Sequence, residues 1–172
     1  MNRRTNHIVQ LSQVNLVSVL LLFPFSICSN AQYVTSKFAG TYSFGKDIEK
    51  ERVGTVIVYP ETDSTILYYI DLNRGAPSYN MGSLYSRVKL KNGEAEFQTQ
   101  VSPNKCCKWV FKFSNEALTI ATVENCVDCG FGYHVYVDGK YFRISKKIPE
   151  HFVNGEGRKI FFKETTPEKY LK

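Results

Sequence analysis

Apolar and polar residues alternate with a period of two along most of the chain after residue 32, and no long segment there has helical periodicity. Valine, isoleucine, tyrosine, phenylalanine and threonine fill the alternating segments, as is typical of a pleated, half-buried sheet. The pattern therefore predicts an all-β protein. The expected strands are 38–44, 52–59, 65–72, 83–90, 94–99, 107–113, 118–124, 133–137, 140–145 and 159–163.

Three short turns fix the expected strand pairing. Asn92-Gly93 and Asp138-Gly139 each separate two alternating runs, and such a dipeptide favours a type I′ hairpin because both central residues need positive φ. A weaker turn is expected at Asn115-Glu116, and the register follows by counting outward from each turn. The expected pairs are Leu90 with Ala95, Val88 with Phe97, Ser86 with Thr99, Phe113 with Leu118, Phe111 with Ile120, Trp109 with Thr122, and Val135 with Phe142.

Consecutive hairpins of about eight to ten short strands predict an antiparallel meander. Two architectures suit such a meander, a small closed barrel and a two-sheet sandwich. Closure removes exposed strand edges, so the barrel is the favoured expectation and the sandwich is the alternative.

The start of the chain has the pattern of an export signal. Basic residues precede the apolar run 16–27, which is too short to span a bilayer, and small residues follow at positions 29 and 31. We therefore expect a signal peptide over 1–31, a single domain over 32–172, no membrane span, and a periplasmic or extracellular location. A lipid anchor at Cys28 is the less favoured alternative, because the residues before it fit a lipoprotein signal poorly.

Charge excludes one class of partner. The chain carries a formal charge of +6, but its lysines and arginines are scattered along the alternating segments, as on a solvated sheet face. Nucleic-acid binding needs a concentrated basic stripe, so a nucleic-acid partner is not expected.

Four cysteines remain after the expected cleavage, and an even number in an exported chain favours disulfides. The hairpin register places Cys107 opposite Glu124, which predicts the bridges Cys107–Cys126 and Cys106–Cys129; a bulge of one residue would exchange the partners. A zinc site is the alternative, but neighbouring cysteines on a strand point to opposite faces and two CxxC knuckles are not present. No metal and no cofactor are expected.

The segment Phe38-Ala39-Gly40-Thr41-Tyr42 resembles the F-x-G-x-[WY] start of lipocalin-like (calycin) barrels, with Tyr42 where tryptophan is usual. The resemblance implies a barrel whose mouth accommodates a ligand, and it transfers no functional residue. In size and export the chain also resembles periplasmic lysozyme-inhibitor barrels, although their Ser-Gly-x-x-Tyr motif is absent.

Two regions could bind a partner. The connection 73–82 is long, and long loops at a barrel mouth often carry function. In the expected last hairpin, phenol, imidazole and guanidinium groups would share one outward face and suit an anionic or carbohydrate ligand, although cross-strand aromatic pairs also stabilise sheets. The candidate ligand-binding residues are Arg74, Tyr79, His134, Tyr136, Tyr141 and Arg143.

No catalytic site is expected. His134 has no recognisable nucleophile motif near it, and no pair of carboxylates has a spacing that suggests acid and base roles. The sequence therefore predicts an exported, non-catalytic protein that binds a small or lipidic ligand in or at the mouth of the barrel. The alternative is a protein-facing envelope module or enzyme inhibitor that uses the 73–82 loop and the last hairpin.

Overall fold

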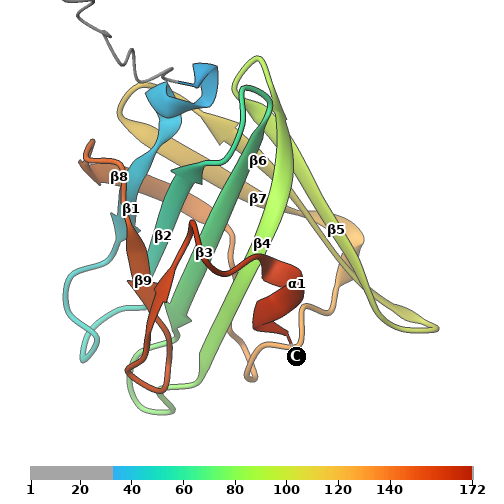
Figure 1. Ribbon diagram of the computed structural model, residues 1–172. Helices are drawn as coiled ribbons and strands as arrows, with labels where there is room; N and C mark the ends of the chain where they lie inside the picture. Colours follow the sequence, from blue (N-terminus) through green and yellow to red (C-terminus); the bar gives the residue numbers. More distant parts are fainter. Residues whose placement is uncertain (1–32, 172) are drawn as a thin grey trace, which may run out of the picture. The chain divides into compact units, whose positions relative to one another are not determined.

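A computed structural model describes residues 33–171 as an antiparallel meander that closes into a barrel, in the order β1 to β8 (Figure 1). The expected all-β barrel is confirmed, and the two-sheet sandwich is not formed. The expected signal peptide and Cys28 lie outside the described residues. The elements are the 3₁₀ helix η1 (Val34–Phe38), β1 (Gly40–Phe44), β2 (Val53–Pro60), β3 (Thr65–Asn73), β4 (Met81–Lys91), β5 (Glu94–Ser102), β6 (Lys105–Phe113), β7 (Ala117–Val127), β8 (Gly139–Ser145), β9 (His151–Val153), β10 (Lys159–Phe161) and α1 (Pro167–Tyr170).

Large aromatic side chains pack the middle of the barrel. The Tyr68 ring lies 5.0 Å from Phe111, and the Trp109 ring lies 5.0 Å from Phe97, measured between centroids. All four residues are buried, as are the inward aliphatic residues of β2 and β3 around them. The interior is therefore a filled hydrophobic core.

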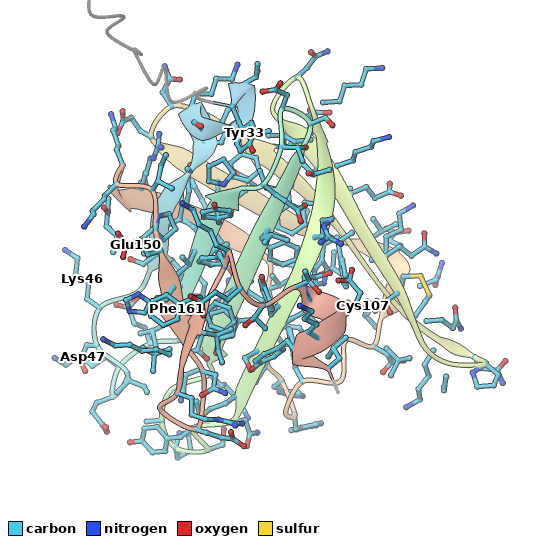
Figure 2. The ribbon with its side chains drawn as sticks, in the orientation of Figure 1. Tyr33, Lys46, Asp47, Cys107, Glu150 and Phe161 are labelled. Atoms are coloured by element: carbon cyan, nitrogen blue, oxygen red, sulfur yellow. A yellow bond between two sulfur atoms is a disulfide. The ribbon has the colours of Figure 1, made fainter. Side chains whose placement is uncertain are left out.

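A second core lies on the outer face of the sheet. Tyr69 of β3 stacks on Phe152 of β9 with ring centroids 4.0 Å apart, and the Tyr85 hydroxyl donates a hydrogen bond of 2.7 Å to the Thr165 carbonyl. Figure 2 shows aromatic side chains gathered around the labelled Phe161, between the β9–β10 pair and the barrel wall. Strand β3 is thus covered on both faces, which explains its uninterrupted buried run over 66–70.

The hairpin at Asn92-Gly93 forms as expected, with φ of 54° and 83° at its two central residues. Leu90 pairs with Ala95 and Lys91 with Glu94, but the β4–β5 ladder ends there. The expected pairs Val88–Phe97 and Ser86–Thr99 are wrong. Strand β4 continues beside β3, beneath α1, whereas β5 continues beside β6 in a long hairpin that diverges from β4 (Figure 1).

The hairpin at Asn115-Glu116 confirms all three expected pairs, from Phe113–Leu118 to Trp109–Thr122. Beyond Trp109 the register shifts, so that Cys107 pairs with Val127 and not with Glu124. The extra residues form a bulge in β7, with Asn125 at φ 65° inside it.

The bulge exchanges the disulfide partners. Four cysteines form two disulfides as expected, but the bridges are Cys106–Cys126 and Cys107–Cys129, so the predicted connectivity is wrong. The predicted pairing assumed that the β6–β7 register continues without a break from Trp109 to Cys107. The exchanged pairing is the one that a bulge in this hairpin produces.

The expected hairpin at Asp138-Gly139 is also wrong. The Asp138 carboxylate accepts hydrogen bonds of 2.7 Å from both the backbone N–H and the hydroxyl of Thr122, so Asp138 anchors a loop to β7. Residues 133–137 form no strand. Strand β8 instead pairs with β7 and with β1, and this pairing closes the barrel.

Candidate functional site

The segment 128–138, which we call the mouth loop, connects β7 to β8 and reaches the start of β4. The disulfide Cys107–Cys129 ties it to β6. The Gly132 N–H donates a hydrogen bond of 3.0 Å to the Met81 carbonyl, and the Asn80 side-chain amide donates one of 2.8 Å to the Tyr133 carbonyl. Covalent and hydrogen bonds to two strands therefore hold the mouth loop in place.

Phe131 of the mouth loop packs onto the barrel core. Its ring centroid lies 5.8 Å from that of Trp109. A Cβ atom at Gly82 would lie only 2.4 Å from the Phe131 Cγ, so the ring occupies the space that a side chain at position 82 would need. Glycine at 82 allows this close approach. Phe131 thereby separates the filled interior from the outside.

A pocket of about 640 Å³ opens between the mouth loop and the adjoining ends of β5, β6 and β7. We call it the mouth pocket. In Figure 2 the labelled Cys107, whose bridge holds this region, lies far down the barrel from the labelled Tyr33 beside η1. The pocket is lined by Val101, Lys105, Trp109, Thr122 and residues 127–138.

Exposed rings surround this pocket. Tyr133 and Tyr136 are 74% and 56% exposed, which is unusual for side chains of their size. The His134 ring stacks on Tyr133 with centroids 3.9 Å apart and lies 6.0 Å from Tyr136. Buried Trp109 also lines the pocket, and its Nε1–H points at Cys129 Sγ over 3.1 Å.

His134 has a backbone φ of 60°, in the left-handed region that is uncommon for residues other than glycine. Such a conformation costs on the order of 1–2 kcal/mol and persists only where the surroundings fix it. Here the anchors at Cys129 and Asp138 on either side hold the segment. The result is that three neighbouring rings face one pocket.

Three charged side chains line the mouth pocket, and each of them has a partner. Lys105 Nζ lies 4.0 Å from the Asp128 carboxylate at the exposed rim. Both carboxylate oxygens of Asp138 accept hydrogen bonds from Thr122. Within residues 33–171 no group of three or more histidine, cysteine or acidic side chains could hold a metal ion. The pocket therefore offers ring faces and a few rim charges.

Two of the six predicted ligand-binding residues, His134 and Tyr136, line the mouth pocket. Tyr141 was expected to face outward with them, but it is buried and donates a hydrogen bond of 2.7 Å to the Val137 carbonyl. Burial raises the pKa of its phenol well above the usual range. The expected outward patch of the last hairpin does not form, because the hairpin itself does not form.

Arg143 closes the other end of the barrel. Its guanidinium donates hydrogen bonds to the carbonyls of Lys37 at 2.9 Å and Asn115 at 3.3 Å, and also to the Ala39 carbonyl, and it lies 5.6 Å from the Tyr42 ring. The Tyr42 hydroxyl in turn donates to the Phe38 carbonyl at 2.7 Å. Arg143 is thus a structural residue that joins η1 to the sheet.

Arg74 and Tyr79 lie in the 73–82 loop and do not line the mouth pocket. Arg74 Nη1 donates to the Ser78 hydroxyl over 3.3 Å, and the exposed Tyr79 hydroxyl donates to Glu49 over 2.5 Å. This bond to the carboxylate raises the pKa of Tyr79. The loop adjoins the mouth loop through Asn80. It is an ordered neighbour of the pocket rather than part of its wall.

Tyr133, Trp109 and Phe131 are pocket residues that sequence reasoning missed. The signal that could have found Phe131 and Tyr133 is the position of four aromatic or heteroaromatic residues within 131–136, shortly after Cys129. A segment held by a disulfide and bearing so many rings is suited to a loop that presents them. Because apolar and polar residues alternate over 133–137, this segment was predicted to be a strand.

No family model, curated protein or solved structure matches the chain. Its closed antiparallel barrel of eight strands agrees in general shape with the lipocalin-like barrels that the Phe38–Tyr42 segment resembles. No helix within residues 33–171 is long and apolar enough to cross a membrane. Function therefore has to be argued from the mouth pocket itself.

Proposed function

We propose that this protein is an exported, non-catalytic binding protein that holds a small ring-containing ligand in the mouth pocket. The observation that carries the proposal is the group of exposed rings, Tyr133, His134 and Tyr136, that an ordered loop presents to one pocket. Ligand pockets in proteins commonly measure about 300–1,000 Å³, and the 640 Å³ here lies in that range.

The filled barrel core decides where the ligand lies. A lipidic chain inside the barrel would need an empty apolar interior, but Trp109, Phe111 and Tyr68 occupy it. A flat ligand at the mouth needs only ring faces. Stacking on an aromatic side chain contributes about 0.5–1.5 kcal/mol beyond area burial, so two or three such contacts give measurable affinity.

The ordered mouth loop favours binding further. A ligand site that is held in place before binding avoids the cost of ordering side chains on association. The Cys107–Cys129 bridge and the bonds at Gly132 and Asp138 provide this order. Disulfides persist in oxidising compartments, which agrees with the export that the sequence predicts.

Phenol and methyl β-glucopyranoside are suitable first probes, because one presents an aromatic ring and the other a sugar ring. Each is titrated into the oxidised protein while amide shifts of the mouth loop are followed by two-dimensional NMR. We expect shifts in 128–138 with at least one probe. Tyr136→Ala should weaken that binding about tenfold, because a stacking face is lost.

Tyr33→Ala is the matched control, since Tyr33 is also an exposed tyrosine but does not line the pocket. It should leave the affinity unchanged. Fluorescence of Trp109 gives a second readout, because it is the only tryptophan in the chain and it lines the pocket. Shifts that map away from the mouth loop, or equal affinities for all three proteins, would contradict the proposal.

A protein-facing role remains the second candidate. Tyr79 of the β3–β4 connection and Met81, the first residue of β4, are 40% and 53% exposed, which suits contact with another protein. This role needs no ring ligand. The same titration separates the two candidates, because a protein-facing module would bind neither probe at the mouth loop.

A further inference from the structure

A second pocket, of about 410 Å³, lies on the other side of the segment Cys129–Phe131. We call it the Asp71 pocket. It shares Cys129, Gly130 and Phe131 with the mouth pocket, so the two pockets adjoin across these three residues. The rest of its wall is formed by Asp71, Met81, Gly82, Ser83 and Gly155.

Asp71 is the only charged residue that lines this pocket. Its side chain is half-buried, and within residues 33–171 it makes no ion pair and no hydrogen bond to another side chain. Burial raises the pKa of Asp71, and the Leu72 backbone N–H lowers it by a smaller amount. A negative charge without a counter-charge in the pocket wall favours a positively charged ligand.

A buried hydroxyl beside Asp71 also lacks a partner. Tyr69 precedes Asp71 by two residues on the same face of β3, and Ser83 of β4 pairs directly with Asp71. The Tyr69 side chain is 2% exposed, and its hydroxyl meets no group at hydrogen-bond geometry. Burial, and then the Asp71 carboxylate, raise the pKa of Tyr69 to about 12, while the nearby Ser83 hydroxyl lowers it. The Tyr69 hydroxyl does not itself line the pocket, but Asp71 and Ser83 beside it do.

We propose that the Asp71 pocket binds a primary ammonium group, and that this group belongs to the same ligand whose ring occupies the mouth pocket. The proposal rests on the proposed function for its ring site. It defines the ligand class as a ring compound that carries an amine and crosses the Cys129–Phe131 segment.

The number of acceptors fits an ammonium group. An ammonium has three N–H donors, and the Asp71 carboxylate and the Ser83 hydroxyl, which both line the pocket, provide acceptors for them. A divalent metal ion such as calcium takes six to eight oxygen ligands, usually with several carboxylates. One carboxylate with one hydroxyl is a poor match for such an ion and a good match for a single positive charge.

The test uses ω-phenylalkylamines with two, four or six methylene groups, each compared with its N-acetyl derivative. The derivative keeps the ring and the chain but loses the charge. Affinities are measured by isothermal titration calorimetry on the oxidised protein. For the chain length that spans the two pockets, we expect the amine to bind about tenfold or more tightly than its acetylated form, since hydrogen bonds that involve a charged group are stronger than those between neutral groups.

Asp71→Asn should abolish the preference for the amine, and Ser83→Ala should reduce it. Asp128→Asn is the matched control, because it removes a carboxylate from the mouth pocket and leaves the Asp71 pocket unchanged. It should keep the preference. Thermal unfolding followed by circular dichroism verifies that each variant is folded.

The outcomes separate the two proposals. If neither the amines nor their N-acetyl derivatives bind the wild-type protein, or if their binding is unchanged by Tyr136→Ala, the proposed ring site is wrong. If both compounds bind equally and Tyr136→Ala weakens both, the ring site holds and the ammonium site is overturned. Loss of the preference in Asp128→Asn instead of Asp71→Asn would place the ammonium in the mouth pocket and would also overturn it.

Discussion

The two disulfides should stabilise the protein in a coupled, non-additive way. Cys106–Cys126 and Cys107–Cys129 join residues 20 and 22 apart in sequence. Either bridge alone removes the entropy of a loop of that length from the unfolded chain, which amounts to about 3 kcal/mol. Once one bridge is present, the second closes only a ring of about six residues, 106–107 and 126–129, and contributes about 2 kcal/mol.

Replacing the cysteines of one bridge by alanine should therefore lower the free energy of unfolding by about 2 kcal/mol, and replacing all four by about 5–6 kcal/mol. The sum of the two single losses falls short of the joint loss by about 1 kcal/mol. Cys107 is fully buried whereas Cys106 is only partly so, and replacing Cys107 and Cys129 should cost about 1 kcal/mol more from lost packing, both in the single-bridge variant and in the variant that lacks both bridges.

Urea unfolding of the four proteins, followed by Trp109 fluorescence and by circular dichroism, measures these free energies. The slope of the transition should increase as bridges are removed, because the unfolded chain expands. Single-bridge losses that add simply to the joint loss would refute the small-ring argument. They would indicate that the two bridges constrain separate parts of the unfolded chain.

Two further outcomes are expected. Gly82→Ala should lower the free energy of unfolding in urea by about 1–3 kcal/mol, because the new Cβ would lie 2.4 Å from the Phe131 Cγ. Gly155→Ala should have little effect, because a Cβ there would meet nothing within 4 Å. Equal effects of the two substitutions would contradict the packing of Phe131 against Gly82. Asp71→Asn should stabilise the protein at pH 7, because burial raises the pKa of Asp71 and the charged form is disfavoured on folding; the gain should disappear below the unfolded aspartate pKa of about 3.9. A loss of stability at pH 7 would show instead that the carboxylate has a favourable partner.

The sequence was sufficient to predict those parts of the fold that depend only on neighbouring residues. The Asn115-Glu116 turn and the alternation beside it determine the register from Phe113–Leu118 to Trp109–Thr122, because both depend on residues within a few positions of the turn. The Asn92-Gly93 turn is predicted for the same reason. Its ladder then ends early because β4 follows β3 beneath a C-terminal segment that lies far away in the sequence.

The candidate site was harder to predict because it depends on tertiary contacts. Asp138-Gly139 has the sequence of a hairpin turn, but the Asp138 carboxylate accepts hydrogen bonds from Thr122 of β7 and no hairpin forms there. The bulge at Asn125, which decides the disulfide pairing, has no strong local signal. Two of the six candidate residues reached the mouth pocket, because the ring-rich segment was recognised while its backbone was assigned to a strand.

The outer core on β3 has a consequence for how the protein is made. Synthesis runs from the N-terminus, so all eight barrel strands emerge before Phe152 and Phe162, which cover Tyr69 and Tyr85. A nascent barrel therefore displays a strip of aromatic surface until the final segment is released, and such surface promotes association between incomplete chains. A premature stop codon ahead of position 152 would make that exposure permanent.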